Sequence, residues 1–120
     1  IAFSPMGSPC RPERDTEEGD VVTFEMPELQ EIAKAHNCHP ALICMKWAVQ
    51  RGHVPIPFSI YENEYVGNLR TVTEDFLTEE EMETLRKADR NARLIKGKVF
   101  LWEGAKDWRD IWDGEDEENN

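Results

Sequence analysis

The chain is poor in positive charge, in paired cysteines and in long apolar runs. Of its 120 residues, lysine and arginine total 14 against 25 aspartates and glutamates, which gives a formal net charge of −11. A field of this sign repels nucleic-acid phosphates and anionic lipid headgroups. No apolar stretch approaches the roughly 20 residues that a membrane-spanning helix needs. We therefore expect neither nucleic acid nor a membrane among the partners.

The three cysteines, Cys10, Cys38 and Cys44, are an odd number without the spacing of a disulfide framework. Such usage is typical of a reducing compartment, so we expect a cytoplasmic protein. His36 and His39 lie close to two of the cysteines, which raises the alternative of a metal site. Their spacing matches no familiar zinc pattern, and structural roles are the prediction for all of them.

The length suits one small domain or part of a larger one. Ile1 opens directly on an apolar, strand-like run without a polar lead-in. A domain rarely starts within its own core, so we expect the C-terminal part of a larger domain. The alternative is a complete small α/β domain.

Strands and helices are predicted to alternate along the chain. Residues 1–3 read as a short buried strand and residues 53–57 as a second, which two prolines weaken. Between them, Pro27 and Pro40 each begin a helix, and the first helix carries a shared face of Leu29, Ile32, Ala33 and His36. The second helix ends at Arg51-Gly52. This order indicates a parallel α/β arrangement.

Two further helices are predicted after the second strand. The first begins near Asn63 as a cap and carries an apolar stripe of Tyr65, Leu69 and Val72. The second opens with a capping box between Thr78 and Glu81. In the tail, a short amphipathic helix would place three apolar residues on one face: Trp108, Ile111 and Trp112.

Five short motifs follow one another along the chain: Ile-Ala-Phe-Ser-Pro-Met-Gly at 1–7, His-Asn-Cys-His-Pro-Ala at 36–41, Trp-Ala-Val-Gln-Arg-Gly at 47–52, Val-Pro-Ile-Pro-Phe-Ser at 54–59 and Phe-Leu-Thr-Glu-Glu-Glu-Met at 76–82. In order and spacing they resemble the last two strands and the following helices of the aldo-keto reductases. Each motif alone is weak, but their shared order is a specific signal.

The resemblance implies the C-terminal portion of a (β/α)₈ TIM barrel. Because such a barrel needs about 250 residues, we expect a βαβα wedge of parallel strands and not a complete barrel. Residues 1–92 would belong to the barrel and residues 93–112 to a substrate-side loop. Residues 113–120 would form an acidic end that we expect to be disordered. The remainder of the barrel would be the partner of this wedge.

The resemblance also implies reduction of aldehydes and ketones to alcohols with NADH or NADPH. In the family a tyrosine, supported by lysine, aspartate and histidine in the first half of the barrel, polarises the carbonyl. None of these four positions falls within the 120 residues, so we expect the chain alone to be inactive. Similarity of residues 93–97 and 102–104 to one branch of the family suggests a sugar-derived carbonyl substrate.

Residues from both strand ends align with the family's cofactor site: Phe3, Ser4, Met6, Gly7, Ser8, Phe58, Ser59, Ile60, Tyr61, Glu64 and Asn68. Phe58 replaces a lysine and Glu64 an arginine, both of which contact the 2′-phosphate of NADPH in relatives. The resemblance therefore implies a preference for NADH. Phe100 and Trp102 would line the substrate pocket, or alternatively pack on the exterior of the barrel.

A second interpretation is a binding or structural protein that kept the fold and lost the nucleotide site. Phe58, Glu64 and Gly67, which replaces a glutamate, support this alternative, because fold does not guarantee function.

Overall fold

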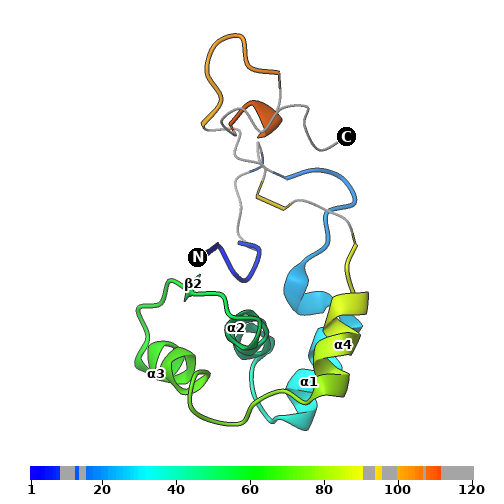
Figure 1. Ribbon diagram of the computed structural model, residues 1–120, viewed down its shortest axis with the longest axis vertical. Helices are drawn as coiled ribbons and strands as arrows, with labels where there is room; N and C mark the ends of the chain where they lie inside the picture. The colour runs from blue at the N-terminus through cyan, green and yellow to red at the C-terminus, as the bar shows by residue number, and fades with distance from the viewer. Residues whose placement is uncertain (9–12, 14–15, 91–93, 96–99, 107, 112–120) are drawn as a thin grey trace.

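The computed structural model describes residues 1–8, 13, 16–90, 94–95, 100–106 and 108–111 (Figure 1). In chain order, these residues form strand β1 (Ala2–Phe3), the 3₁₀ helix η2 (Thr23–Glu25), helices α1 (Pro27–Ala35) and α2 (Pro40–Gln50), strand β2 (Pro55–Ile56), helices α3 (Glu62–Arg70) and α4 (Glu79–Lys87), and the 3₁₀ helix η4 (Trp108–Ile111). The predicted alternation of strands and helices is confirmed.

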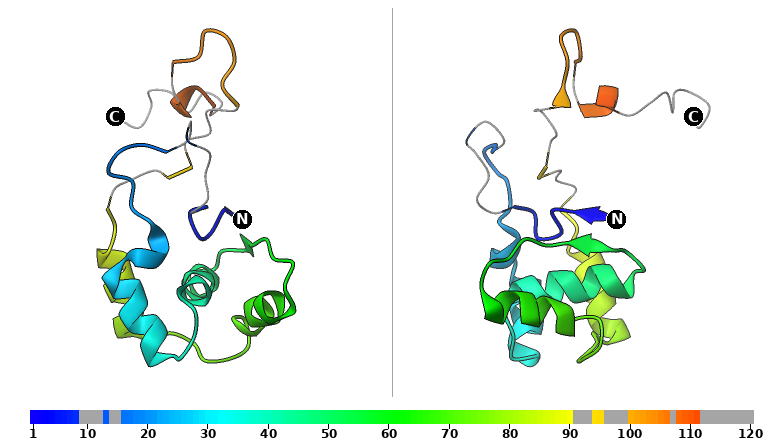
Figure 2. Two further views of the ribbon diagram at one scale, coloured as in Figure 1. Left: turned by 180° about the vertical axis from the view of Figure 1, so that it is seen from behind. Right: turned by 90° about the vertical axis from the view of Figure 1, so that its left-hand side faces the viewer.

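The two strands pair in parallel, with Ala2 opposite Pro55 and Phe3 opposite Ile56. The Ala2 N–H donates to the Val54 carbonyl oxygen at 2.8 Å. The parallel pairing confirms the prediction from sequence, and the four helices lie on one side of the sheet (Figure 2). The predicted burial of the first strand is wrong, because Phe3 is 71% exposed. In the described residues, helices cover only one face of these strands.

The core lies between α1, α2 and the segment before α4. It is built from Leu29, Ile32 and Ala33 of α1 together with Ile43, Cys44 and Leu77. The predicted apolar face of the first helix is therefore correct for three of its four residues. His36 is the exception, because it follows the helix as its C-cap.

Helix α2 ends where its sequence predicts. Gly52 has a φ of +81° in the left-handed region, which favours glycine. The N–H groups of Gly52 and His53 donate to the carbonyl oxygens of Val49 and Ala48. This turn satisfies the last carbonyls of the helix and directs the chain into β2.

Helix α3 differs from its prediction in two ways. It begins at Glu62, close to the predicted start, but its N-cap is Tyr61 and not Asn63. Its predicted stripe of Tyr65, Leu69 and Val72 is exposed. The helix approaches α2 through Gly67 instead, where an added Cβ would lie 3.3 Å from Leu42 Cδ2. The missing side chain at Gly67 therefore permits the close packing of α3 on α2.

Helix α4 carries the predicted capping box. The Thr78 N–H donates to Glu81 Oε2 at 2.8 Å, and the Glu81 N–H donates to Thr78 Oγ1 at 3.2 Å. These bonds satisfy two backbone amides at the helix start. The capping box is a local motif, so it forms as its sequence predicts.

Thr78→Ala is expected to lower the free energy of unfolding by about 1 kcal/mol, because the side-chain acceptor of the box is lost. Chemical denaturation of the complete protein measures the change. Thr78→Ser is the matched control, since it keeps a hydroxyl at the cap and should stay close to wild type. Equal destabilisation by both substitutions would contradict a capping role.

The tail contains η4, a 3₁₀ helix of four residues, where a short amphipathic helix was predicted. Trp112 and the acidic residues 113–120 lie outside the described residues, as do most of the residues at the predicted boundary near 92. Among the residues described, no helix has the length and apolar character to cross a membrane.

Candidate functional site

Two loops meet at the carboxyl edge of the sheet. Residues 4–8 follow β1 and residues 57–61 follow β2. Because the strands run parallel in register, both loops leave the same edge. Ligands of parallel α/β proteins bind at this edge. The structure thus brings together the two parts of the predicted cofactor site.

The first loop is a tight turn with unusual backbone geometry. Ser4, Gly7 and Ser8 have φ values of 48°, 74° and 45°. The Gly7 N–H donates to the Ser4 carbonyl oxygen at 2.9 Å, and Ser8 Oγ donates to Ser4 Oγ at 3.3 Å. Positive φ at a serine costs free energy and is concentrated at binding sites. The turn gathers two hydroxyls and several backbone amides, which are groups that bind phosphate.

Gly7 has a second reason to be glycine. A Cβ at this position would lie 2.7 Å from Thr23 Oγ1 and 2.8 Å from Leu94 Cδ1. The backbone of the loop therefore packs directly against η2 and Leu94, which fixes the position of the turn.

The second loop presents apolar side chains to solvent. Phe58 is 83% exposed, and Ile60 and Tyr61 are also exposed. Ser59 Oγ donates to Glu64 Oε2 at 2.7 Å. The Glu64 N–H in turn donates to the Tyr61 carbonyl oxygen at 3.0 Å. These bonds fold the loop back onto the first turn of α3.

The charges around the second loop are acidic. Glu62 and Glu64 occupy the first turn of α3, where carboxylates interact favourably with the helix dipole. Residues 58–68 contain no lysine, arginine or histidine. Asn68 lies farther along the helix, and its carbonyl oxygen accepts from Thr71 Oγ1 at 2.6 Å. This loop offers hydroxyl and carboxylate groups but no cation.

The predicted substrate residues are not brought to these loops. Phe100 and Trp102 are exposed. Their segment, residues 100–106, lies apart from the strands in Figures 1 and 2. The structure therefore places the two candidate cofactor loops at one edge of the sheet and leaves the substrate candidates separate from them.

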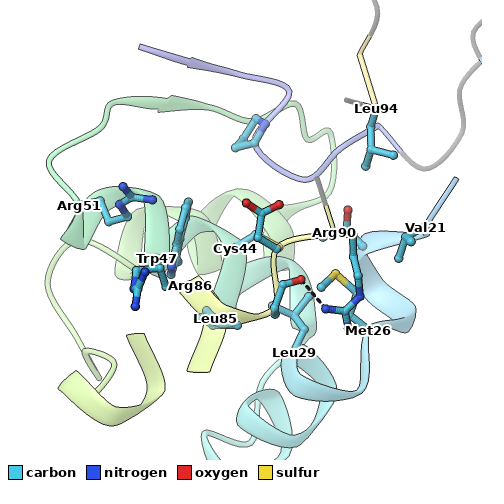
Figure 3. A pocket seen from close by; sticks show the side chains of 14 residues that line it. Val21, Met26, Leu29, Cys44, Trp47, Arg51, Leu85, Arg86, Arg90 and Leu94 are labelled. Carbon is cyan, nitrogen blue, oxygen red and sulfur yellow. Dashed lines mark hydrogen bonds between the residues drawn. The ribbon is translucent and has the colours of Figure 1, made fainter. Parts of the chain in front are cut away.

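A cavity of about 430 Å³ lies among α1, α2 and α4 (Figure 3). Its apolar lining includes Met26, Leu29, Cys44, Trp47 and Leu85. Arg51 stacks over the Trp47 ring at 4.5 Å from the ring centre. The lining of this cavity includes none of the described cofactor candidates. No motif in the sequence indicated this cavity, because its walls come from segments far apart in the chain.

The two cysteines that the structure describes have unreactive thiols. Burial raises the pKa of the Cys44 thiol to about 12 and also raises the pKa of Cys38. Both side chains therefore remain protonated near neutral pH and are poor nucleophiles and metal ligands. Cys10 lies outside the described residues. Within the part of the chain that the structure describes, no group of three or more histidine, cysteine, aspartate or glutamate side chains is arranged to hold a metal ion.

Comparison with known proteins connects this geometry to a family. Residues 1–90 match the model of the "Aldo/keto reductase family". The chain is 36% identical over 110 residues to "Aldo-keto reductase family 1 member A1-A" of Danio rerio, across 91% of this chain and 32% of that protein. An aldo/keto reductase of Synechocystis is 31% identical over 113 residues, across 93% of this chain and 34% of its own length.

A third relative, "Estradiol 17 beta-dehydrogenase 5" of Mus musculus, is 34% identical over 100 residues, across 83% of this chain and 30% of its own length. The chain thus spans about a third of the length of the curated relatives it matches.

Proposed function

The chain belongs to the aldo/keto reductase family, and we propose that it forms the C-terminal third of a (β/α)₈ barrel that reduces carbonyl compounds with a nicotinamide cofactor. The observation that carries this proposal is the parallel pairing of β1 and β2. It places the loops at 4–8 and 57–61 on one edge, as a shared cofactor site requires. The remainder of the barrel would cover the exposed face of the strands.

The residues of the first loop fit part of such a cofactor. Phe3 has an exposed ring that can stack on a flat nicotinamide. The hydroxyls of Ser4 and Ser8 can donate to a diphosphate, and the packed backbone at Gly7 keeps the turn in place. When bound, the cofactor supplies the hydride, and these residues hold and orient it.

The side chains of the second loop are better suited to bind the adenosine of NADH, whose ribose has a free 2′-hydroxyl, than that of NADPH, whose ribose carries a 2′-phosphate. Ser59 holds the Glu64 carboxylate at the start of α3, where it can accept a hydrogen bond from a ribose hydroxyl. Phe58 offers an apolar surface and no positive charge. We therefore propose NADH as the preferred cofactor.

The group that polarises the carbonyl would come from outside this chain. The resemblance places that tyrosine, with its lysine, aspartate and histidine, in the first half of the barrel. We propose a small carbonyl compound as substrate, with Phe100 and Trp102 close to it in the complete protein. A sugar-derived aldehyde remains the proposed class.

The proposed setting of the protein is the cytoplasm. Cys38 and Cys44 are free thiols, which fits a reducing compartment. The net charge of −11 disfavours binding to nucleic acid or anionic membranes.

Cofactor binding by the first loop is tested with a pair of substitutions at one position. In the complete protein, Phe3→Leu is expected to weaken cofactor binding by roughly 2- to 10-fold, because the aromatic contact contributes about 0.5–1.5 kcal/mol. Phe3→Tyr is the matched control, since it keeps the ring. Binding is followed by tryptophan fluorescence and turnover by oxidation of the reduced cofactor with an aldehyde. Unchanged binding in Phe3→Leu would contradict the stacking role.

A second candidate is a non-catalytic protein of the same fold that has lost the nucleotide. Phe58 and Glu64 favour it, because they stand at positions where the resemblance implies cations. The same titration separates the two candidates, because a complete protein that binds neither NADH nor NADPH would support the second.

A further inference from the structure

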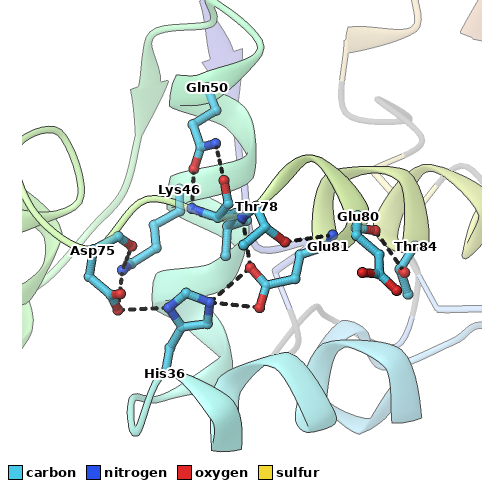
Figure 4. Close-up of polar contacts among 9 residues, drawn as sticks. His36, Lys46, Gln50, Asp75, Thr78, Glu80, Glu81 and Thr84 are labelled. Atoms are coloured by element: carbon cyan, nitrogen blue, oxygen red, sulfur yellow. Dashed lines mark hydrogen bonds and ion pairs between the residues drawn. The ribbon is translucent and has the colours of Figure 1, made fainter.

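His36 is held between two carboxylates that come from different elements (Figure 4). Its Nδ1 lies 2.7 Å from Oδ2 of Asp75, a residue in the connection between α3 and α4. Its Nε2 lies 2.9 Å from both Glu81 Oε1 and Glu81 Oε2, in the first turn of α4. The His36 side chain is only 10% exposed. One ring therefore joins the end of α1 to two segments that follow it by about forty residues.

The protonation state of the His36 ring decides whether both of its hydrogen bonds can form. A neutral imidazole carries one N–H, whereas the protonated ring carries two. Ionised carboxylates can only accept hydrogen bonds. With Asp75 and Glu81 ionised, both bonds form only when His36 carries its second proton.

The surrounding charges balance when His36 is protonated. Lys46 of α2 is 5% exposed, and its Nζ donates to the Asp75 carbonyl oxygen and, at 3.0 Å, to Asp75 Oδ2. Two cations then face two carboxylates. The nearby Cys38 thiol adds no charge, because burial raises its pKa. Loss of the His36 proton leaves two carboxylates against Lys46 alone.

The pKa values agree with this geometry. Burial by itself would lower the pKa of His36, but the hydrogen bonds and charges of Glu81 and Asp75 outweigh it and raise that pKa above 6.5. Hydrogen bonds from His36 and Lys46 lower the pKa of Asp75. Burial alone would raise the pKa of Glu81, but bonds from the Thr78 amide and from His36 lower it. Both carboxyls are therefore ionised where His36 titrates.

We propose that His36 is a proton-dependent latch that ties residues 71–78 and the start of α4 to α1 and α2. Because its folded-state pKa is raised, the stabilisation is complete below about pH 6.5 and is lost as the pH rises through the folded-state pKa. A second contact in the same place is independent of pH. Gln50 Nε2 donates to the Leu77 carbonyl oxygen at 2.9 Å, and the Leu77 N–H donates to Gln50 Oε1 at 2.7 Å. The opened latch therefore loosens the connection without releasing Leu77.

The latch is tested in the complete protein by NMR titration of the His36 ring and by amide hydrogen exchange. His36 should titrate above 6.5, its unperturbed value. The rate of amide hydrogen exchange in residues 74–84, after correction for the intrinsic effect of pH on exchange, should rise several-fold between about pH 6 and about pH 8. Each unit by which the measured pKa exceeds the unperturbed value corresponds to a tenfold change in the latch equilibrium. A His36 pKa at or below the unperturbed value would overturn the proposal.

Glu81→Gln separates the latch from the capping box. A glutamine at this position can still accept from the Thr78 N–H, so the helix start is preserved. Its amide group can donate to Nε2 of a neutral ring, which removes the need for the second proton. We expect the His36 pKa to fall and the rise in exchange with pH to shrink toward zero. His53→Gln, at an exposed residue, is the matched control and should leave both unchanged. An unaltered exchange profile in Glu81→Gln would also overturn the latch.

Discussion

NADH is expected to bind the complete protein more tightly than NADPH by on the order of 10²–10⁴ in affinity. A 2′-phosphate is a dianion that needs charged donors when it is taken partly out of water. Such charge-assisted bonds contribute about 1.5–3 kcal/mol each, and the family resemblance implies that Phe58 and Glu64 stand in place of the residues that would make two of them. Parallel titrations with both cofactors, followed by tryptophan fluorescence, measure the ratio. Tighter binding of NADPH would contradict the prediction.

The geometry around Glu64 strengthens this expectation. Ser59 Oγ donates to its carboxylate at 2.7 Å, which holds the negative charge beside the second loop. Arg70, the next cation along the chain, occupies the last turn of α3. Six residues of helix separate it from Glu64 by roughly 9 Å along the axis. Arg70 is therefore poorly placed to replace the missing cation.

A double substitution reverses the charge of the site. Phe58→Lys with Glu64→Arg should shift the preference toward NADPH, because it restores two cations at the loop. Phe58→Lys with Glu62→Arg is the matched control, since it makes the same change of charge in the same helical turn. The control should shift the preference less, because the resemblance implies a phosphate-binding position at residue 64 and not at residue 62.

The elements that could be predicted from sequence are those fixed by local chemistry. The capping box of Thr78 and Glu81 spans four residues and needs no partner outside its own turn. Gly52 ends α2 through a backbone conformation that the glycine itself permits. The parallel pairing of β1 and β2 also followed, because alternating strands and helices leave few other arrangements. The family resemblance is confirmed by the match over residues 1–90.

The elements that could not be predicted depend on contacts between distant residues. Periodicity showed that Tyr65, Leu69 and Val72 share a face, but not whether anything covers that face. His36 was assigned to an apolar face, although its partners are 39 and 45 residues away. Hydrophobic pattern carries no information about such partners. The bond between Ser59 and Glu64 joins residues only five positions apart, but both side chains are polar, so the hydrophobic pattern did not indicate it either.

The exposed apolar surface of the two strands is expected to destabilise the chain when the rest of the proposed barrel is absent. Phe3, Val54, Ile56 and Phe58 are all exposed on or beside the two strands, and Ile1 is 92% exposed. An isolated pair of strands is marginally stable at best, and its open edges can pair with other chains. In the proposed barrel, neighbouring strands would cover these residues.

The 120-residue chain on its own is therefore expected to show a shallow thermal transition or none. Among the described residues the main buried cluster is small, with Leu29, Ile32, Ala33, Ile43, Cys44 and Leu77, and it does little to offset the conformational entropy of ordering the chain. Circular dichroism measures the transition, with sedimentation to establish that the sample is monomeric. The complete protein, in which the strands have neighbours, should melt sharply under the same conditions. A sharp cooperative transition in the monomeric 120-residue chain would show that these two strands and four helices stabilise one another without the rest of a barrel.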